Sequence, residues 1–150
     1  MIRQIIPTGF CLKCSGCCRF SQKSSPWVPH LLKEEAKLKT KVKIVAHPGQ
    51  GNFLCAALDP GKNRCRIYPR RPFECRLYPF LLNRRGRKTF LSLDLNCPFA
   101  QANWQNPEFK AHIRRLVGFF NRPDWLEKIR NNPQLIQDYQ KAEDLIELIL

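Results

Sequence analysis

The sequence lacks long hydrophobic runs, and this excludes a membrane-spanning segment. Its longest uninterrupted apolar stretches are about half a dozen residues, against the roughly 20 that a membrane helix needs. The first ten residues contain neither an extended apolar stretch nor a small-residue cleavage site, so they do not resemble a secretory signal. We therefore expect a cytoplasmic protein.

Familiar catalytic constellations are also missing. The sequence shows no Gly-rich phosphate loop, no Ser/His/Asp set and no paired carboxylates. It has only three histidines, His30, His47 and His112, and none has a partner at a metal-ligand spacing. We expect each to be a surface residue rather than a ligand. The sequence therefore assigns no catalytic residue and leaves open whether the protein is an enzyme.

Cysteine, by contrast, is abundant: the 150 residues include 8. Such a set would be a disulfide framework in a secreted protein, but in a reducing compartment it more often indicates metal or redox chemistry. A metal is the simplest agent that could hold clustered thiols. We predict that all of them are metal ligands: Cys11, Cys14, Cys17, Cys18, Cys55, Cys65, Cys75 and Cys97.

The first four cysteines form one compact run. Cys11, Cys14 and Cys17 are spaced i, i+3, i+6, as in the C-x2-C-x2-C run that holds iron in bacterial ferredoxins. Zinc sites usually need only C-x2-C pairs from two segments. The spacing favours a 4Fe–4S iron–sulfur cluster, with zinc as the alternative. Gly16 would let the loop fold back so that backbone N–H groups face the sulfurs, and the adjacent Cys17 and Cys18 should face different directions.

The number of sites stays open at this point. Eight thiols can form two four-thiolate sites, or one site with four spare thiols. Cys55 lies between Leu54 and Ala56 in a predicted strand, where a cysteine can also be a small buried hydrophobe.

Acidic residues are few, and the basic excess is concentrated. The chain has 26 Lys and Arg against 12 Asp and Glu, a net charge of +14, and residues 61–90 hold ten bases and one acid. This field would attract an anionic partner such as a nucleic acid or a phosphorylated ligand, or balance a metal–thiolate site. Arg71 and Arg76 flank Cys75 and are predicted to bind the cofactor by stabilising thiolate or an anion.

Turn residues and apolar periodicity predict an α+β fold. Turn chemistry at residues 59–63 indicates a hairpin between residues 53–58 and 64–68, and residues 42–46 and 88–95 alternate like strands. We expect loop over residues 1–20, a helix within 26–39 and one helical turn beginning at Pro72.

The C-terminal residues predict helices. Asn106 and Pro107 mark a helix start, followed by an apolar face that includes Phe109. Asn132 and Pro133 repeat the signal before a second apolar series that ends at residue 149. We therefore predict a small cysteine-rich, metal-stabilised domain over residues 1–103 with short strands and a hairpin. C-terminal α-helices over residues 104–150 would pack on it as a single compact unit.

Residues 9–100 resemble the CxxCxxCC cysteine-cluster family, the YkgJ-like group of zinc- or iron-chelating domains. The motif residues are the run Cys11–Cys18, then Cys65-Arg-Ile-Tyr68, Arg71-Pro72 and Cys75-Arg76-Leu-Tyr78-Pro. The resemblance implies that all eight cysteines belong to the family's cysteine set. The same module occurs in flagellin lysine N-methylase, which suggests an accessory role in a protein-modifying, methylase-like system.

Three functional hypotheses follow. The first is a cysteine-ligated metal-binding protein that carries an iron–sulfur cluster or zinc and acts in redox or electron transfer. The second is a basic nucleic-acid-binding module stabilised by zinc, and the third is the accessory module that the resemblance implies. A four-thiolate zinc site would be structural, because its closed shell leaves no position for a substrate.

Overall fold

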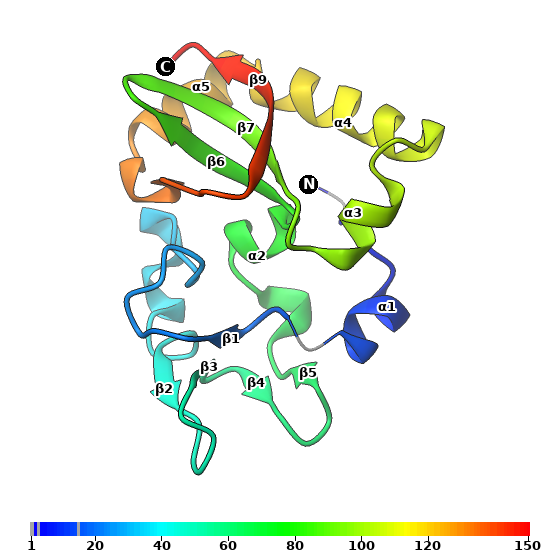
Figure 1. The fold of residues 1–150 in the computed structure, drawn as a ribbon. Coiled ribbons are helices and arrows are strands. Elements are labelled where there is room, and N and C mark those ends of the chain that lie inside the picture. Colours follow the sequence, from blue (N-terminus) through cyan, green and yellow to red (C-terminus); the bar gives the residue numbers. More distant parts are fainter. Residues whose placement is uncertain (1, 3, 15) are drawn as a thin grey trace. The chain divides into compact units, whose positions relative to one another are not determined.

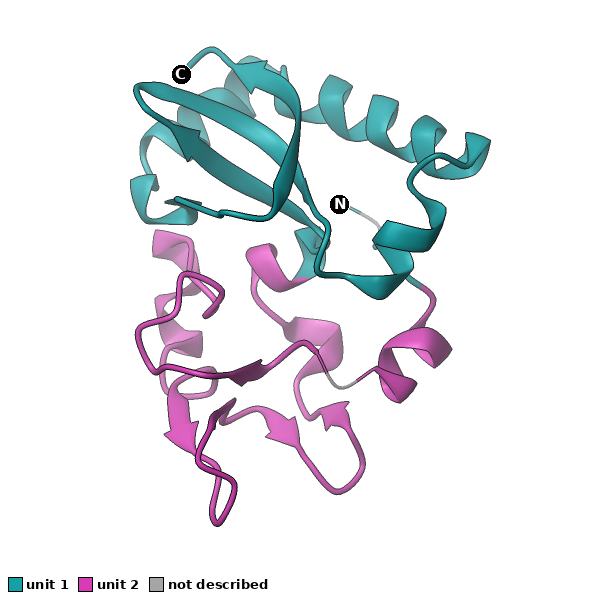
Figure 2. Ribbon diagram, in the orientation of Figure 1, with its two compact units in different colours: residues 1–6, 76–150 teal, residues 7–75 magenta. Residues whose placement is uncertain are grey.

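The computed structural model describes residues 2, 4–14 and 16–150, which divide into two compact units (Figure 2). Unit 1 is Met1–Ile6 with Arg76–Leu150, and unit 2 is Pro7–Cys75. The division at residue 75 falls inside the segment predicted as one metal-binding domain, and the domain role of residues 1–103 stays a prediction. Helices and short strands both occur along the chain, which confirms the α+β class (Figure 1).

Unit 2 is built from short elements. Its three-stranded sheet has the order β1-β3-β2, with antiparallel neighbours, and a separate two-stranded hairpin joins β4 to β5. Short helices complete the unit, and the last of them, α2, continues across the unit boundary. The elements are α1 (Thr8–Lys13), β1 (Arg19–Phe20), η1 (Lys33–Leu38), β2 (Ile44–Ala46), β3 (Phe53–Cys55), β4 (Leu58–Asp59), β5 (Arg64–Cys65), η2 (Tyr68–Arg70) and α2 (Phe73–Leu77).

The turn chemistry of residues 59–63 produces the predicted hairpin. Asp59 accepts the Lys62 backbone N–H at 3.2 Å, and Asn63 takes a left-handed backbone with φ of 47°. The hairpin strands are shorter than predicted, because β3 pairs instead with β1 and β2. The predicted helix within 26–39 is reduced to the 3₁₀ helix η1, and the loop expected over residues 1–20 contains α1.

The buried apolar residues of unit 2 include Leu32, Leu54, Leu58 and Phe73. One apolar cluster of this unit has Phe20, Val42, Cys55 and Ala57 as its buried members. Half-buried side chains that pack against them include Cys18, Trp27, Val28, Leu31, Ile44, Phe53, Cys65 and Ile67. Small domains bury little surface and often need an additional stabilising element such as a metal. Three of the predicted metal ligands belong to this cluster: Cys55 is one of its buried members, and Cys18 and Cys65 pack against it.

Unit 1 holds a four-stranded sheet of order β8-β6-β7-β9. The strands are β6 (Phe80–Arg85), β7 (Lys88–Asp94), β8 (Ile136–Gln137) and β9 (Ala142–Leu148), and the helices are α3 (Pro98–Asn103), α4 (Pro107–Phe120), α5 (Pro123–Arg130) and the 3₁₀ helix η3 (Pro133–Leu135). The strand predicted at 88–95 and the helix predicted from Pro107 are both confirmed. None of the helices in the described part of the chain is both long and apolar enough to cross a bilayer.

The second C-terminal helix predicted after Pro133 is wrong. Beyond η3 the chain forms β8 and β9, and β9 pairs antiparallel with β7 from Ala142 to Leu148. The backbone of β7 supplies the hydrogen-bond partners of β9, and the periodicity of the local sequence does not show that these partners are present. Glu147 of β9 also meets Lys88 of β7 at 2.7 Å. Tertiary pairing therefore overrides the local helical pattern.

His112 is not the surface residue that the sequence predicted. It is 8% exposed and stacks on Phe80 with ring centroids 5.6 Å apart. Burial lowers the pKa of its imidazole, and the neighbouring charge of Arg115 adds to the effect. The buried face of α4 also includes Phe109 and Leu116. His112 lies at helical spacing from both, so the sequence contained the signal for its burial.

One carboxylate ties three strands of unit 1 together. Asp144 of β9 accepts hydrogen bonds from Ser92 of β7 at 2.6 Å and from Asn83 of β6 at 3.2 Å, and it pairs with Arg85 at 3.2 Å. Partial burial alone would raise its pKa, but the Ser92 and Arg85 hydrogen bonds outweigh that effect and lower it. The ladder between β7 and β9 is irregular between Leu91 and Ser92, beside this contact.

We expect Asp144→Asn to lower the free energy of unfolding by about 2 kcal/mol near neutral pH, because a charged hydrogen-bond acceptor is lost. The lowered pKa means that the carboxylate stabilises the fold above its unfolded pKa of about 4. That contribution disappears as the pH falls through the folded value.

Urea titrations of both proteins between neutral and acidic pH measure this difference. Glu147→Gln is the control: its partner Lys88 is 61% exposed, so the loss should stay below about 1 kcal/mol. A stability gap for Asp144→Asn that is unchanged at acidic pH would contradict the assignment.

Candidate metal centre

Four cysteines that are distant in sequence gather in unit 2. Cys18 precedes β1, Cys55 ends β3, Cys65 ends β5 and Cys75 lies within α2. Cys18 and Cys55 share a thiol hydrogen bond, and the charges of Cys55 and Cys65 both act on Cys75. We call these four residues the thiol cluster. They meet because β1 and β3 pair and because the hairpin and α2 follow directly along the chain.

The backbone at Cys18 separates it from its neighbour. Cys18 has a left-handed φ of 64°, a conformation that a non-glycine residue adopts at some cost in energy. Its carbonyl accepts the Cys55 backbone N–H at 3.0 Å. Cys17 is exposed, whereas Cys18 packs against the apolar core. The prediction that the two adjacent side chains face different directions is confirmed.

The thiol cluster carries an electrostatic conflict. The hydrogen bond from Cys18 lowers the pKa of Cys55 to about 7, while that same bond, together with burial, raises the pKa of Cys18. Burial also raises the pKa of Cys65 and Cys75, and the positive charge of Arg71 opposes both shifts. Ionisation of one thiol, that of Cys55, is thus favoured, whereas ionisation of the other three thiols costs free energy. A bound cation is the charge that would let the remaining thiols ionise.

The donor chemistry of the thiol cluster fits zinc or iron, since both bind thiolate sulfur. Within residues 2, 4–14 and 16–150, no group of three or more His, Cys, Asp or Glu side chains is placed so that it could hold a metal ion.

Two glutamates fix the segment that carries Cys75. Glu35 accepts the Phe73 backbone N–H at 2.7 Å and the Leu32 backbone N–H at 3.2 Å. Glu74 accepts the His30 backbone N–H at 2.5 Å. Both contacts tie the residues around η1 to the start of α2. Glu35 was not singled out from the sequence, although its place three residues after Leu32 at a helix start is typical of a capping glutamate.

Asn63 plays the same positioning role for the first cysteine run. Its side-chain amide donates to the carbonyls of Leu12 and Cys14, each at 2.7 Å, and its side-chain oxygen accepts from Arg19 at 2.8 Å. The hairpin turn thereby holds the end of α1. The Gly16 backbone N–H points to the Cys14 sulfur at 3.5 Å, as predicted. Nothing in the local sequence could reveal the role of Asn63, which depends on contacts 44 residues away or more.

The remaining predicted ligands lie outside the thiol cluster. Cys11 and Cys14 are half-buried in unit 2. Cys97 is buried in unit 1 at the start of α3, and this burial raises the pKa of its thiol. Hydrogen bonds from the backbone amides of Ala100 and Phe99 and from the Tyr78 side chain lower the pKa, but burial has the larger effect. A ligand role for each of these cysteines stays a prediction.

Comparison with protein families decides what kind of domain this is. The model named CxxCxxCC, described as "Putative zinc- or iron-chelating domain", matches residues 10–103. The chain belongs to the CxxCxxCC family. Searches of curated proteins and of solved structures find no match. The family assignment supports metal binding and confirms the resemblance that the cysteine motif indicated. The family description names both zinc and iron.

The basic segment of this CxxCxxCC protein is divided between the two units. Arg71 lies in unit 2 with its guanidinium 3.8 Å above the Tyr68 ring, and Arg76 begins the main segment of unit 1. Arg84 and Arg85 donate to backbone carbonyls of unit 1, including that of Tyr139 at 2.9 Å. Part of the charge that suggested an anionic partner therefore stabilises strand contacts.

We expect Glu35→Gln to weaken metal binding by about tenfold or more, because loss of the carboxylate loosens the Phe73 amide and with it Cys75. Outer contacts that orient metal ligands typically contribute 10- to 100-fold in affinity. Competition with a chromogenic chelator measures the change. Glu34→Gln, an exposed position on the same helix with the same change in charge, should stay near wild type. Equal losses in the two variants would refute the positioning role.

Proposed function

We propose that the thiol cluster holds an iron–sulfur cluster and that the protein acts in electron transfer. The supporting observation is the convergence of Cys18, Cys55, Cys65 and Cys75 from four separate segments of a chelating domain. Four thiolates are the usual ligand set of a 4Fe–4S centre. Such a centre would supply one-electron chemistry, while the chain's own residues bind it and limit its exposure to water.

The donor set is compatible with a cubane, which holds one thiolate at each of its four irons. The i, i+3, i+6 run of Cys11, Cys14 and Cys17 adds sequence support for iron–sulfur.

Zinc is the second candidate, and one observation favours it. The hydrogen bond between the Cys18 and Cys55 thiols brings two sulfurs into direct contact, as two thiolates on one zinc would be. A zinc bound by all four thiolates would be structural, because no coordination position remains for a substrate. The protein would then be a scaffold instead of a redox carrier.

The surroundings of the thiol cluster suit a redox centre. Cys18 and Cys65 are half-buried and pack against an apolar cluster of unit 2. The charge of Arg71 acts on Cys65 and Cys75, and a fixed positive charge stabilises an anionic centre. No comparable arrangement in the described residues supports a nucleic-acid-binding module or a protein-modifying accessory role.

Anaerobic purification tests the proposal directly. We expect a brown protein that contains iron and acid-labile sulfide, and we expect Cys65→Ser and Cys55→Ser to lose most of that iron. His112→Gln, which alters a buried side chain in unit 1, should retain it. Elemental analysis, sulfide assay and the absorption spectrum give the answer. A colourless protein with stoichiometric zinc would replace the iron–sulfur proposal with the structural one.

Metal removal should unfold unit 2. Cys55 is buried in an apolar cluster of this unit and Cys18 and Cys65 pack against it. In cysteine-rich domains the free energy of metal binding becomes free energy of folding. Hydrogen exchange before and after anaerobic chelation should show lost protection over residues 7–75, and reloading with metal should restore it. Unchanged protection in that range would show that the thiols do not carry a stabilising metal.

A further inference from the structure

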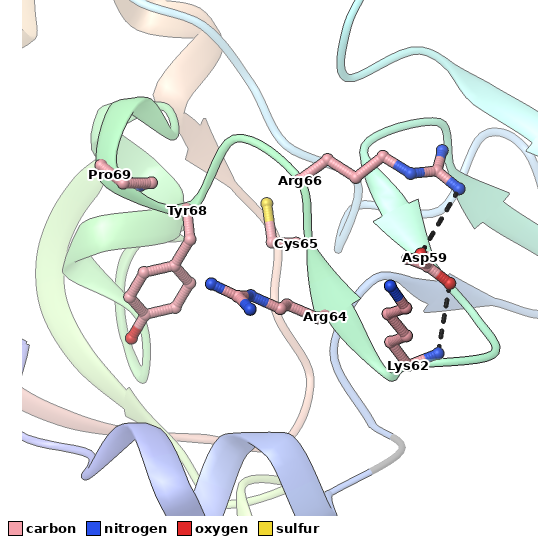
Figure 3. A pocket seen from close by; sticks show the side chains of 7 residues that line it. All are labelled: Asp59, Lys62, Arg64, Cys65, Arg66, Tyr68 and Pro69. Carbon is pink, nitrogen blue, oxygen red and sulfur yellow. Dashed lines mark hydrogen bonds and ion pairs between the residues drawn. The ribbon is translucent and has the colours of Figure 1, made fainter.

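A pocket of about 300 Å³ opens beside the thiol cluster (Figure 3). It is formed entirely within unit 2, by the hairpin of β4 and β5 and by the start of η2. Its lining residues are Asp59, Lys62, Arg64, Cys65, Arg66, Tyr68 and Pro69. A volume of this order matches the lower range of small-molecule sites.

The charge of the lining is strongly positive. Lys62, Arg64 and Arg66 contribute three cations against the single carboxylate of Asp59. Asp59 is already engaged, since it accepts the Lys62 backbone N–H at 3.2 Å and lies 4.0 Å from the Arg66 guanidinium. The structure records no side-chain hydrogen bond or ion pair from Lys62 or Arg64 to any residue that it describes. Two cations thus remain for a ligand.

The turn and the short strand that follows it bring these cations to the pocket. Lys62 lies in the turn between β4 and β5, Arg64 begins β5, and Arg66 directly follows β5. The intervening Cys65 belongs to the thiol cluster, and its sulfur also lines the pocket. The hairpin therefore presents cations to the pocket and a thiol to the candidate metal centre.

An aromatic wall faces the cations. Tyr68 lines the pocket, and Figure 3 shows the Arg64 guanidinium extending toward its ring. The Tyr68 ring is held in place by Arg71, whose guanidinium lies 3.8 Å from the ring centroid, and by a 3.3 Å hydrogen bond between its hydroxyl and that of Thr8. Pro69 extends the apolar surface. A ligand here would meet a flat apolar surface at one end and cations at the other.

We propose that this pocket binds a small organic phosphate. A phosphoryl group carries the charge and the acceptor oxygens that Arg64 and Lys62 require, and guanidinium matches its geometry particularly well. The organic part would pack on Tyr68 and Pro69. This goes beyond the proposed function and does not depend on which metal is bound, because the cations are the protein's own.

The pocket also places such a ligand next to the thiol cluster. Cys65 lines the pocket and interacts electrostatically with Cys55 and Cys75. A phosphate bound there would thus lie beside one proposed metal ligand.

Calorimetric titration of the metal-loaded full chain tests the proposal, with phenyl phosphate and inorganic phosphate as probes at constant ionic strength. We expect saturable binding of one phenyl phosphate per chain, tighter than that of inorganic phosphate. Arg64→Gln should weaken it by about tenfold or more, the loss expected when a charged hydrogen bond is removed. Lys62→Gln, on the exposed turn, is a second variant should Arg64→Gln fail to fold.

Arg70→Gln is the matched control, because Arg70 is exposed, has the same charge and lies outside the pocket lining. It should bind phenyl phosphate within about twofold of wild type, as expected for a charge that makes no direct contact. Metal content is measured for every variant, so failure of the metal site is distinguished from failure of the pocket. Binding that does not saturate, or that Arg64→Gln and Arg70→Gln weaken equally, would overturn the proposal.

Discussion

The burial of several thiols in an apolar cluster is the constraint on which the rest of unit 2 depends. A single thiolate is favoured there, because Cys18 donates a hydrogen bond to Cys55. Additional negative charge is opposed by burial at Cys65 and Cys75, and Arg71 offsets this only in part. A multivalent cation would resolve this conflict, because its positive charge favours the ionised form of every thiol that it contacts.

Polar contacts help to fix the segments that bring the cysteines together. Glu35 and Glu74 bind backbone amides on opposite sides of the contact between η1 and α2. Asn63 binds two carbonyls at the end of α1. Such hydrogen bonds specify direction as well as proximity, which is what a site with fixed ligand geometry requires. The turn that carries Asn63 also forms part of the cationic pocket.

Local chemistry predicted several elements well and others poorly. The Asn106-Pro107 start of α4 and the turn at residues 59–63 were predictable, because proline and turn residues act on their own backbone. The strand β9 was not, because its partner β7 lies far away in sequence and an apolar series at helical spacing also suits an edge strand. The burial of His112 was not predicted, because the neighbouring Arg114 and Arg115 make this part of α4 basic, although His112 itself lies on the apolar face of the helix.

The sequence by itself determined the chemistry of the site: the number of thiols, the compact Cys11–Cys18 run, the basic excess and the CxxCxxCC family. Those features depend on residue type and short spacing, which can be read directly. Only the tertiary structure decided that Cys18 and Cys55 meet across paired strands, and that Cys65 faces both the thiol cluster and the pocket. Such contacts depend on strand pairing between residues that are distant in sequence. The spacing of residues along the chain does not show which distant residues come together when the chain folds.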